Sequence, residues 1–179
     1  MAPSMRLDGT DRHEVGPGFG ASWSPAVSPD GLTVSAAGWN LLEGADQYEG
    51  IFTMSLDGSN PRWVTPFWNP FPHHAWSPDG DWIAVSDNLE DRAKPANLVL
   101  VRPDGSSASD PLFLTNYTRA DQRAAVGSYS PDGQWILFRL REGDLWSLYV
   151  IRPDGSDMEQ LTVPSSLAPL DIDWGPAPG

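Results

Sequence analysis

The chain carries a small set of side chains that could bind a metal ion or act as a general base. His73 and His74 are adjacent, and the chain has only three histidines in all. Asp121, Asp171 and Asp173 could add carboxylates if the fold brought them together. Imidazole and carboxylate groups bind zinc and related metals, and imidazole is a base near neutral pH. Because these groups are few and far apart in sequence, we expect a structural or surface role for the pair, with no metal and no cofactor.

Three further aspartates, Asp30, Asp79 and Asp132, each stand in the sequence Ser-Pro-Asp-Gly. They could be read as acid-base or calcium-binding groups. A tight turn explains them without chemistry, because proline presets φ, aspartate hydrogen-bonds its own backbone and glycine accepts a positive φ. The chain also has no cysteine and no Gly-x-Ser-x-Gly motif of a hydrolase nucleophile. We therefore name no catalytic residue and favour a protein that is not an enzyme.

The turn motif recurs and divides the chain into repeats. Its aspartates are separated by 49 and 53 residues, and a period near fifty with strand-like sequence indicates repeated sheets. Each copy is followed by an apolar strand that enters a second Asp-Gly turn, which is a strong hairpin signal. Each repeat therefore holds four strands, named a to d in chain order. The residues expected to form the a-b and c-d turns are Asp30, Gly31, Asp57, Gly58, Asp79, Gly80, Asp104, Gly105, Asp132, Gly133, Asp154 and Gly155.

Tandem four-stranded antiparallel units predict an all-β fold, a β-propeller whose blades are these units. We expect three complete blades and a split blade shared between the two ends of the chain. The predicted segments are 1–20 (strands c and d of the split blade), 21–68 (blade 1), 69–121 (blade 2), 122–166 (blade 3) and 167–179 (strand a of the split blade). The whole of 1–179 is then one propeller segment.

The repeats closely resemble those of the TolB-type, WD40-like (PD40) β-propeller family. The matching motifs are Trp-Ser-Pro-Asp-Gly at 76–80, Tyr-Ser-Pro-Asp-Gly at 129–133, and Asp-Gly-Ser at 104–106 and 154–156. Blade 1 departs from the pattern, with Val27 in place of the aromatic and Thr33 where Trp82 and Trp135 stand. The resemblance implies a periplasmic or extracellular protein, although this chain shows no signal peptide. It leaves function open, since the family includes binding modules, peptidase-gating domains and enzymes.

A blade buries one face against each neighbour, so an open arc of three blades would leave two apolar faces in water. Three ways of completing the ring of blades fit the sequence. The strand at 171–174 could join the N-terminal strands of its own chain in a small four-bladed ring, or those of a second chain in an eight-bladed dimer. The sequence could also be the C-terminal part of a larger propeller. We favour the homodimer.

Composition restricts the partners. The formal net charge is -13, and nucleic acids and anionic membranes are bound by basic surfaces, so we expect neither. No run of about 18 apolar residues occurs, so we expect no membrane insertion. A neutral or cationic protein or peptide fits this charge.

Antiparallel strand order places the a-b and c-d turns on one rim of the ring and the b-c and d-a connections on the other. The second rim varies in sequence, and variable connections on a rigid scaffold usually carry binding residues. We therefore predict a scaffold that binds a protein or peptide there. The alternatives are a carbohydrate-directed lectin or lyase-like enzyme that uses the histidines and rim aromatics, and an assembly fragment of a larger propeller. The predicted binding residues are Trp39, Glu43, Tyr48, Trp68, His73, His74, Tyr117, Asp121 and Arg123.

Overall fold

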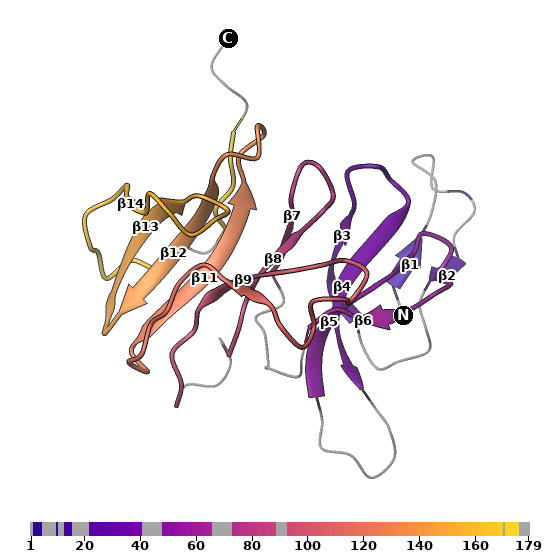
Figure 1. Cartoon of the computed structure of the whole chain (residues 1–179), viewed down its shortest axis with the longest axis horizontal. Coiled ribbons are helices and arrows are strands. Elements are labelled where there is room, and N and C mark those ends of the chain that lie inside the picture. Colours follow the sequence, from indigo (N-terminus) through magenta and orange to yellow (C-terminus); the bar gives the residue numbers. More distant parts are fainter. Residues whose placement is uncertain are drawn as a thin grey trace.

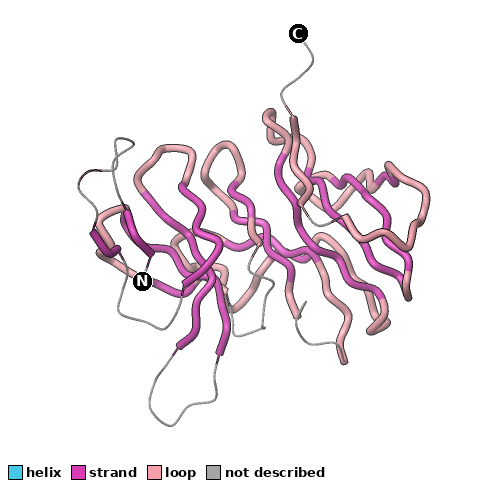
Figure 2. The backbone as a smooth tube through the Cα atoms, turned by 180° about the vertical axis from the view of Figure 1, so that it is seen from behind, coloured by secondary structure: helices cyan, strands magenta, loops and turns pink. Residues whose placement is uncertain are grey.

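The structure is a computed structural model of the whole chain. It describes residues 2–4, 10, 13–15, 22–40, 48–65, 73–88, 93–169 and 171–175. Within these ranges the chain is built from strands, turns and loops, and no helix occurs (Figure 2). Accordingly, these residues contain no helix long and apolar enough to cross a membrane.

Three four-stranded antiparallel sheets follow one another along the chain, side by side (Figure 1). Blade 1 contains β3 (Ser22–Val27), β4 (Thr33–Asn40), β5 (Tyr48–Ser55) and β6 (Arg62–Trp63). Blade 2 contains β7 (Ala75–Trp76), β8 (Ile83–Ser86), β9 (Leu98–Val101) and β10 (Leu112–Phe113). Blade 3 contains β11 (Gln122–Tyr129), β12 (Ile136–Glu142), β13 (Leu145–Ile151) and β14 (Glu159–Gln160). In each blade the spatial order equals the chain order, as predicted. A separate pair joins β1 (Ala2–Ser4) to β2 (His13–Val15).

Each Ser-Pro-Asp-Gly turn is closed by its own side chains. In the β7-β8 turn, the Ser77 hydroxyl donates to Oδ1 of Asp79 at 2.5 Å, and the Asp81 N–H donates to the same oxygen at 3.0 Å. Gly80 follows with φ +77°, a value that a residue with a Cβ rarely adopts. The same bonds recur at Asp30 and Asp132. The three a-b turns project from the same side of the arc, at the top of Figure 1.

The strands of blade 2 are apolar on both sides because this blade is covered on both faces. We use the term leading face for the side of a blade that points toward the preceding blade. The side that points toward the following blade is the trailing face. At the boundary between blades 1 and 2 the buried residues are Ala37, Ile51, Val64, Ile83, Val85, Val99 and Val101. At the boundary between blades 2 and 3, Ala84, Leu98, Leu100 and Leu114 meet Val126, Ile136, Phe138 and Ile151. Consecutive residues of β8 therefore face opposite neighbours, as the strand period of two requires.

The trailing face of blade 3 is covered only in part. The C-terminal segment first extends the sheet edge, with backbone hydrogen bonds between Trp146 and Ser165 of 2.8 and 2.9 Å. It then crosses the face, where the Arg139 guanidinium donates to the Pro169 carbonyl. Leu161, which corresponds in the repeat to Val64 and Leu114, is 51% exposed, whereas those two are 0% and 7% exposed.

The sequence predicts a strand over 171–174, but the structure assigns no strand to residues 171–175. A propeller's strand a forms its ladder with strand b of its own blade, and this segment instead contacts blade 3. Its contacts there include a 3.2 Å hydrogen bond from the Trp174 N–H to the Ser128 hydroxyl.

Candidate functional site

The strand order separates two rims with different construction. We call the side that bears the a-b and c-d turns the turn rim, and the side that bears the b-c and d-a connections the loop rim. Of the predicted binding residues, Glu43 and Trp68 lie outside the described residues. Trp39 is the last residue but one of β4, and Tyr48 begins β5. The two residues flank the b-c connection of blade 1, and only their backbone is described. The loop rim is therefore best described over blades 2 and 3.

Tyr117 lies in the d-a connection between blades 2 and 3 and is held by Asn97. The side-chain oxygen of Asn97 accepts the Tyr117 N–H at 2.6 Å and the Thr115 hydroxyl at 3.1 Å. The ring of Tyr117 is half-buried, and its hydroxyl lies 3.7 Å from Sδ of Met158. Burial raises the pKa of Tyr117 to about 12, with a smaller contribution from Tyr149. The phenol is therefore neutral at physiological pH and offers an apolar ring with a polar tip.

A buried carboxylate lies beneath this connection. Asp87 is 4% exposed, and its Oδ1 accepts the Asn97 N–H at 2.5 Å. Burial raises the pKa of Asp87, although this hydrogen bond and the nearby charges of Lys94 and Arg123 oppose the shift. Asp87 thus joins the start of the b-c connection of blade 2 to its end.

Arg123 anchors the same b-c connection to blade 3. It is 6% exposed, and its guanidinium donates to the carbonyls of Lys94 at 2.9 Å and Asn88 at 3.3 Å. Two backbone hydrogen bonds add to this anchor. The Ala96 N–H donates to the Gln122 carbonyl at 3.1 Å, and the Ala124 N–H donates to the Ala96 carbonyl at 2.9 Å. Arg123 therefore positions the loop rim from below, while Tyr117 lies closer to its surface.

Exposed charges of both signs complete the loop rim over blade 3. Nε of Arg119 lies 3.0 Å from Oδ1 of Asp121, and its Nη2 lies 3.7 Å from Oε1 of Glu142. The hydrogen bond from Arg119 lowers the pKa of Asp121. Asp121 is therefore an ionised surface group of the loop rim.

The two adjacent histidines enter different environments. Nε2 of His74 lies 2.6 Å from the Ser35 hydroxyl, which also accepts the Trp76 indole N–H at 2.7 Å, so His74 belongs to the boundary between blades 1 and 2. His73 is exposed and lines a cavity of about 290 Å³ with Arg139, Asp171, Asp173 and others. Across the described part of the chain, no three His, Cys, Asp or Glu side chains converge as a metal site would require.

Sequence reasoning missed Asp87 and Asn97. Both flank apolar strands, at the end of Val85-Ser86-Asp87 and at the start of Asn97-Leu98-Val99. A polar residue at such a boundary is common, so the signal was visible but unspecific. Only the pairing of β8 with β9 shows that the two meet.

Comparison with known proteins agrees with this architecture. No protein-family model matches the chain. An uncharacterized protein of Agrobacterium fabrum is 27% identical over 147 residues, which are 76% of this chain and 42% of that protein. The Tol-Pal system protein TolB of Anaeromyxobacter dehalogenans is 31% identical over 113 residues, 63% of this chain and 24% of that protein. The chain thus spans less than half the length of these curated relatives.

Solved structures share the fold. A putative TolB from Agrobacterium tumefaciens superposes with a TM-score of 0.67 at 22% identity, over 90% of this chain and 61% of that one. TolB from Acinetobacter baumannii superposes with a TM-score of 0.62 at 19% identity, over 90% of this chain and 37% of that one. A puromycin-hydrolyzing peptidase of Mycobacterium tuberculosis superposes with a TM-score of 0.64 at 20% identity, over 88% of this chain and 24% of that one.

Tandem four-stranded antiparallel blades, with tight turns on one rim and irregular connections on the other, define a β-propeller. The chain resembles TolB in sequence and shares its fold with the solved TolB structures, which confirms the resemblance seen in its motifs. Because a peptidase shares the fold, the fold alone establishes a repeat scaffold and not an activity.

Proposed function

We propose that the protein is a non-catalytic scaffold that binds a protein or peptide partner through its loop rim. One observation carries the proposal: Asn97 and Arg123 fix the connections of the loop rim from within the fold. Ordering flexible loops on binding costs free energy, so a surface that is already ordered binds more tightly. The turn rim is built differently, because each of its a-b turns is held by a local hydrogen bond from a serine hydroxyl to Oδ1 of the turn aspartate.

The chemistry of the loop rim suits a peptide. Tyrosine supplies a large contact area with few rotatable bonds and is enriched in protein interfaces. Beside Tyr117, the charges of Arg119, Asp121 and Glu142 can pair with a partner of either sign. The net charge of -13 favours a partner whose surface is neutral or cationic.

Selection from a phage-displayed peptide library, followed by titration of the enriched peptides, tests the proposal. Tyr117→Ala is expected to weaken binding at least tenfold, which corresponds to about 1.4 kcal/mol. Leu32→Ala is the matched control, because Leu32 is an exposed apolar residue on the turn rim. Enriched peptides that bind equally to Tyr117→Ala would refute the loop rim as their site. Binding to a glycan array without peptide enrichment would favour a carbohydrate ligand instead.

We further propose that the arc closes by forming a homodimer. The observation behind this is Leu161, which is 51% exposed where its repeat equivalents are buried by the following blade. Light scattering should then give twice the chain mass of 19.5 kDa, and Leu161→Glu should shift the protein to monomer. A monomer for the unsubstituted chain would contradict the dimer.

A further inference from the structure

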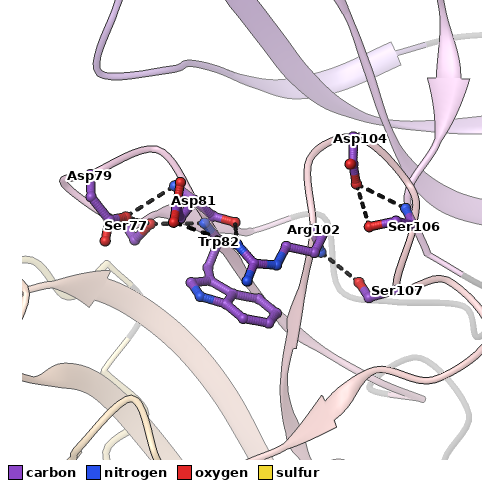
Figure 3. Close-up of polar contacts among 8 residues, drawn as sticks. All are labelled: Ser77, Asp79, Asp81, Trp82, Arg102, Asp104, Ser106 and Ser107. Carbon is purple, nitrogen blue, oxygen red and sulfur yellow. Dashed lines mark hydrogen bonds and ion pairs between the residues drawn. The ribbon is translucent and has the colours of Figure 1, made fainter.

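Blades 2 and 3 each place an arginine over a tryptophan beside the turn rim. The guanidinium carbon of Arg102 lies 3.8 Å from the centre of the Trp82 ring, between the turns that bear Asp79 and Asp104 (Figure 3). In blade 3, Arg152 lies 4.1 Å from the Trp135 ring. The pair thus recurs with the repeat. It fills the space at the trailing side of a blade, since Trp82 packs against the core shared by blades 2 and 3.

Blade 1 lacks both members of this pair. Thr33 holds the position of Trp82, and Ser55 holds the position of Arg102. Thr33 and Ser55 lie opposite each other in the β4-β5 register. Small polar side chains therefore replace a stacked tryptophan and arginine at the boundary between blades 1 and 2.

A cavity occupies this place. It has a volume of about 550 Å³ and is lined by residues of both blades. We call it the interblade pocket and define it by Asp30, Thr33, Ser55, Asp79, Arg102 and Asp104. The half-buried Trp76 adds apolar surface to its wall.

Negative charge predominates around the interblade pocket. Four carboxylates line it, those of Asp30, Asp79, Asp81 and Asp104, against the guanidinium groups of Arg62 and Arg102. Hydrogen bonds from serine hydroxyls lower the pKa of Asp30, Asp79 and Asp104, so these three are ionised at neutral pH. One cation is already engaged, because Nη1 of Arg102 lies 3.5 Å from Oδ2 of Asp81.

We propose that the interblade pocket binds an arginine of a partner peptide together with an adjacent aromatic side chain. The two side chains take the place that the protein's own arginine and tryptophan occupy in the other blades. The guanidinium pairs with the surplus carboxylates, and the ring packs against the apolar wall. This site lies on the turn rim and is independent of the loop-rim proposal.

A blocked dipeptide tests the site directly. N-acetyl-Trp-Arg-amide is titrated into the full chain labelled with ¹⁵N, and the amide shifts of Thr33 and Ser55 are followed. A ligand of this size is expected to bind with a Kd on the order of 1 mM. N-acetyl-Trp-Gln-amide is expected to bind at least fivefold more weakly, because it lacks the charge. Equal binding of the two dipeptides, or no shift at these amides, would overturn the proposal.

Rebuilding the pair in blade 1 provides the decisive variant. Thr33→Trp combined with Ser55→Arg should fill the interblade pocket and reduce dipeptide binding at least tenfold. If this variant folds and binds as the unsubstituted chain does, the site is wrong. Asp30→Asn is a milder variant that keeps a turn-capping side chain and should weaken binding severalfold; unchanged affinity would also count against the site. Tyr117→Ala should leave dipeptide binding unchanged, which separates this site from the loop rim.

Discussion

The indole N–H of Trp76 donates a 2.7 Å hydrogen bond to the Ser35 hydroxyl across the boundary between blades 1 and 2. Tyr129 holds the same position in blade 3, yet its buried hydroxyl has no hydrogen-bond partner among the residues that the structure describes. The repeat equivalent of Ser35 in blade 2 is Ala84, which shares a core cluster with Tyr129 and has no polar side-chain atom. The polar tip of one aromatic is therefore satisfied and that of the other is not.

Tyr129→Phe is expected to leave the free energy of unfolding unchanged or to raise it by about 1 kcal/mol, because it removes a buried hydroxyl without a partner. Trp76→Phe should have the opposite effect and lower the free energy of unfolding by about 1 to 3 kcal/mol, since it removes the hydrogen bond to Ser35 and opens a small cavity. Urea unfolding of the two variants tests this contrast. A clear destabilisation by Tyr129→Phe would mean that its hydroxyl has a partner.

The aspartate turns predict a loss of stability in acid. Hydrogen bonds lower the pKa of Asp79 and of its turn equivalents from an ordinary value of 3.8. A carboxylate whose folded pKa is depressed stabilises the fold above its unfolded pKa, and this stability is lost as the pH falls through the folded pKa. The free energy of unfolding should therefore fall below about pH 4.

Asp79→Asn isolates this effect, because asparagine can accept the same turn bonds but does not titrate. The variant should be slightly less stable than the parent at pH 7, and its free energy of unfolding should fall less steeply between about pH 4 and 2. Asp110→Asn, which removes an exposed aspartate outside the Asp-Gly turns, is the matched control for the loss of one negative charge. Parallel pH curves for Asp79→Asn and the parent would contradict the assignment.

Gly127 controls the docking of the C-terminal segment. It lies at a bulge between β11 and β12, and a Cβ at this position would lie 2.6 Å from Cγ1 of Ile172 and 3.0 Å from the Leu137 carbonyl. Gly127→Ala should therefore displace Ile172, lower the free energy of unfolding by about 1 to 3 kcal/mol and speed proteolysis within residues 163–175. Gly175→Ala is the control, because no atom of the described residues lies within 4 Å of its added Cβ. Equal protease resistance in both variants would show that the segment tolerates the methyl group.

Much of the fold could be predicted because the repeat motifs contain their own hydrogen bonds. Ser77, Asp79 and Gly80 form their turn from neighbours in sequence, so the motif predicts the structure wherever it recurs. The segment at 171–174 shows the limit. It carries the residue pattern of strand a, but a ladder also requires a partner strand, which the pattern alone does not supply.

The candidate sites depend on contacts that local sequence does not encode. His73 and His74 are adjacent, but successive residues of an extended chain point to opposite sides, so they do not act as a pair. Asn97 reaches Tyr117 over 20 residues because β10 returns the chain beside β9. The sequence shows that Thr33 breaks the repeat, while the cavity beside it follows from the packing of blade 1 against blade 2.

Arg123 should contribute more to stability than its exposed neighbour Arg119. Arg123→Met removes a buried guanidinium and its part-buried hydrogen bonds to the carbonyls of Lys94 and Asn88, and we expect the free energy of unfolding to fall by about 1 to 3 kcal/mol. Arg119→Met removes only exposed ion pairs, with Asp121 and Glu142, and should cost at most about 0.5 kcal/mol.

Hydrogen exchange then shows whether Arg123 positions the loop rim. In Arg123→Met, amide exchange should accelerate in the b-c connection of blade 2, at residues 93–97, more than in β12, because the anchor is local. The affinity of this variant for loop-rim peptides should also fall, since the b-c connection of blade 2, once released from its anchor, must be ordered when the peptide binds. Uniform acceleration across all three blades would instead assign Arg123 to global stability, and the pre-ordered rim would no longer explain binding.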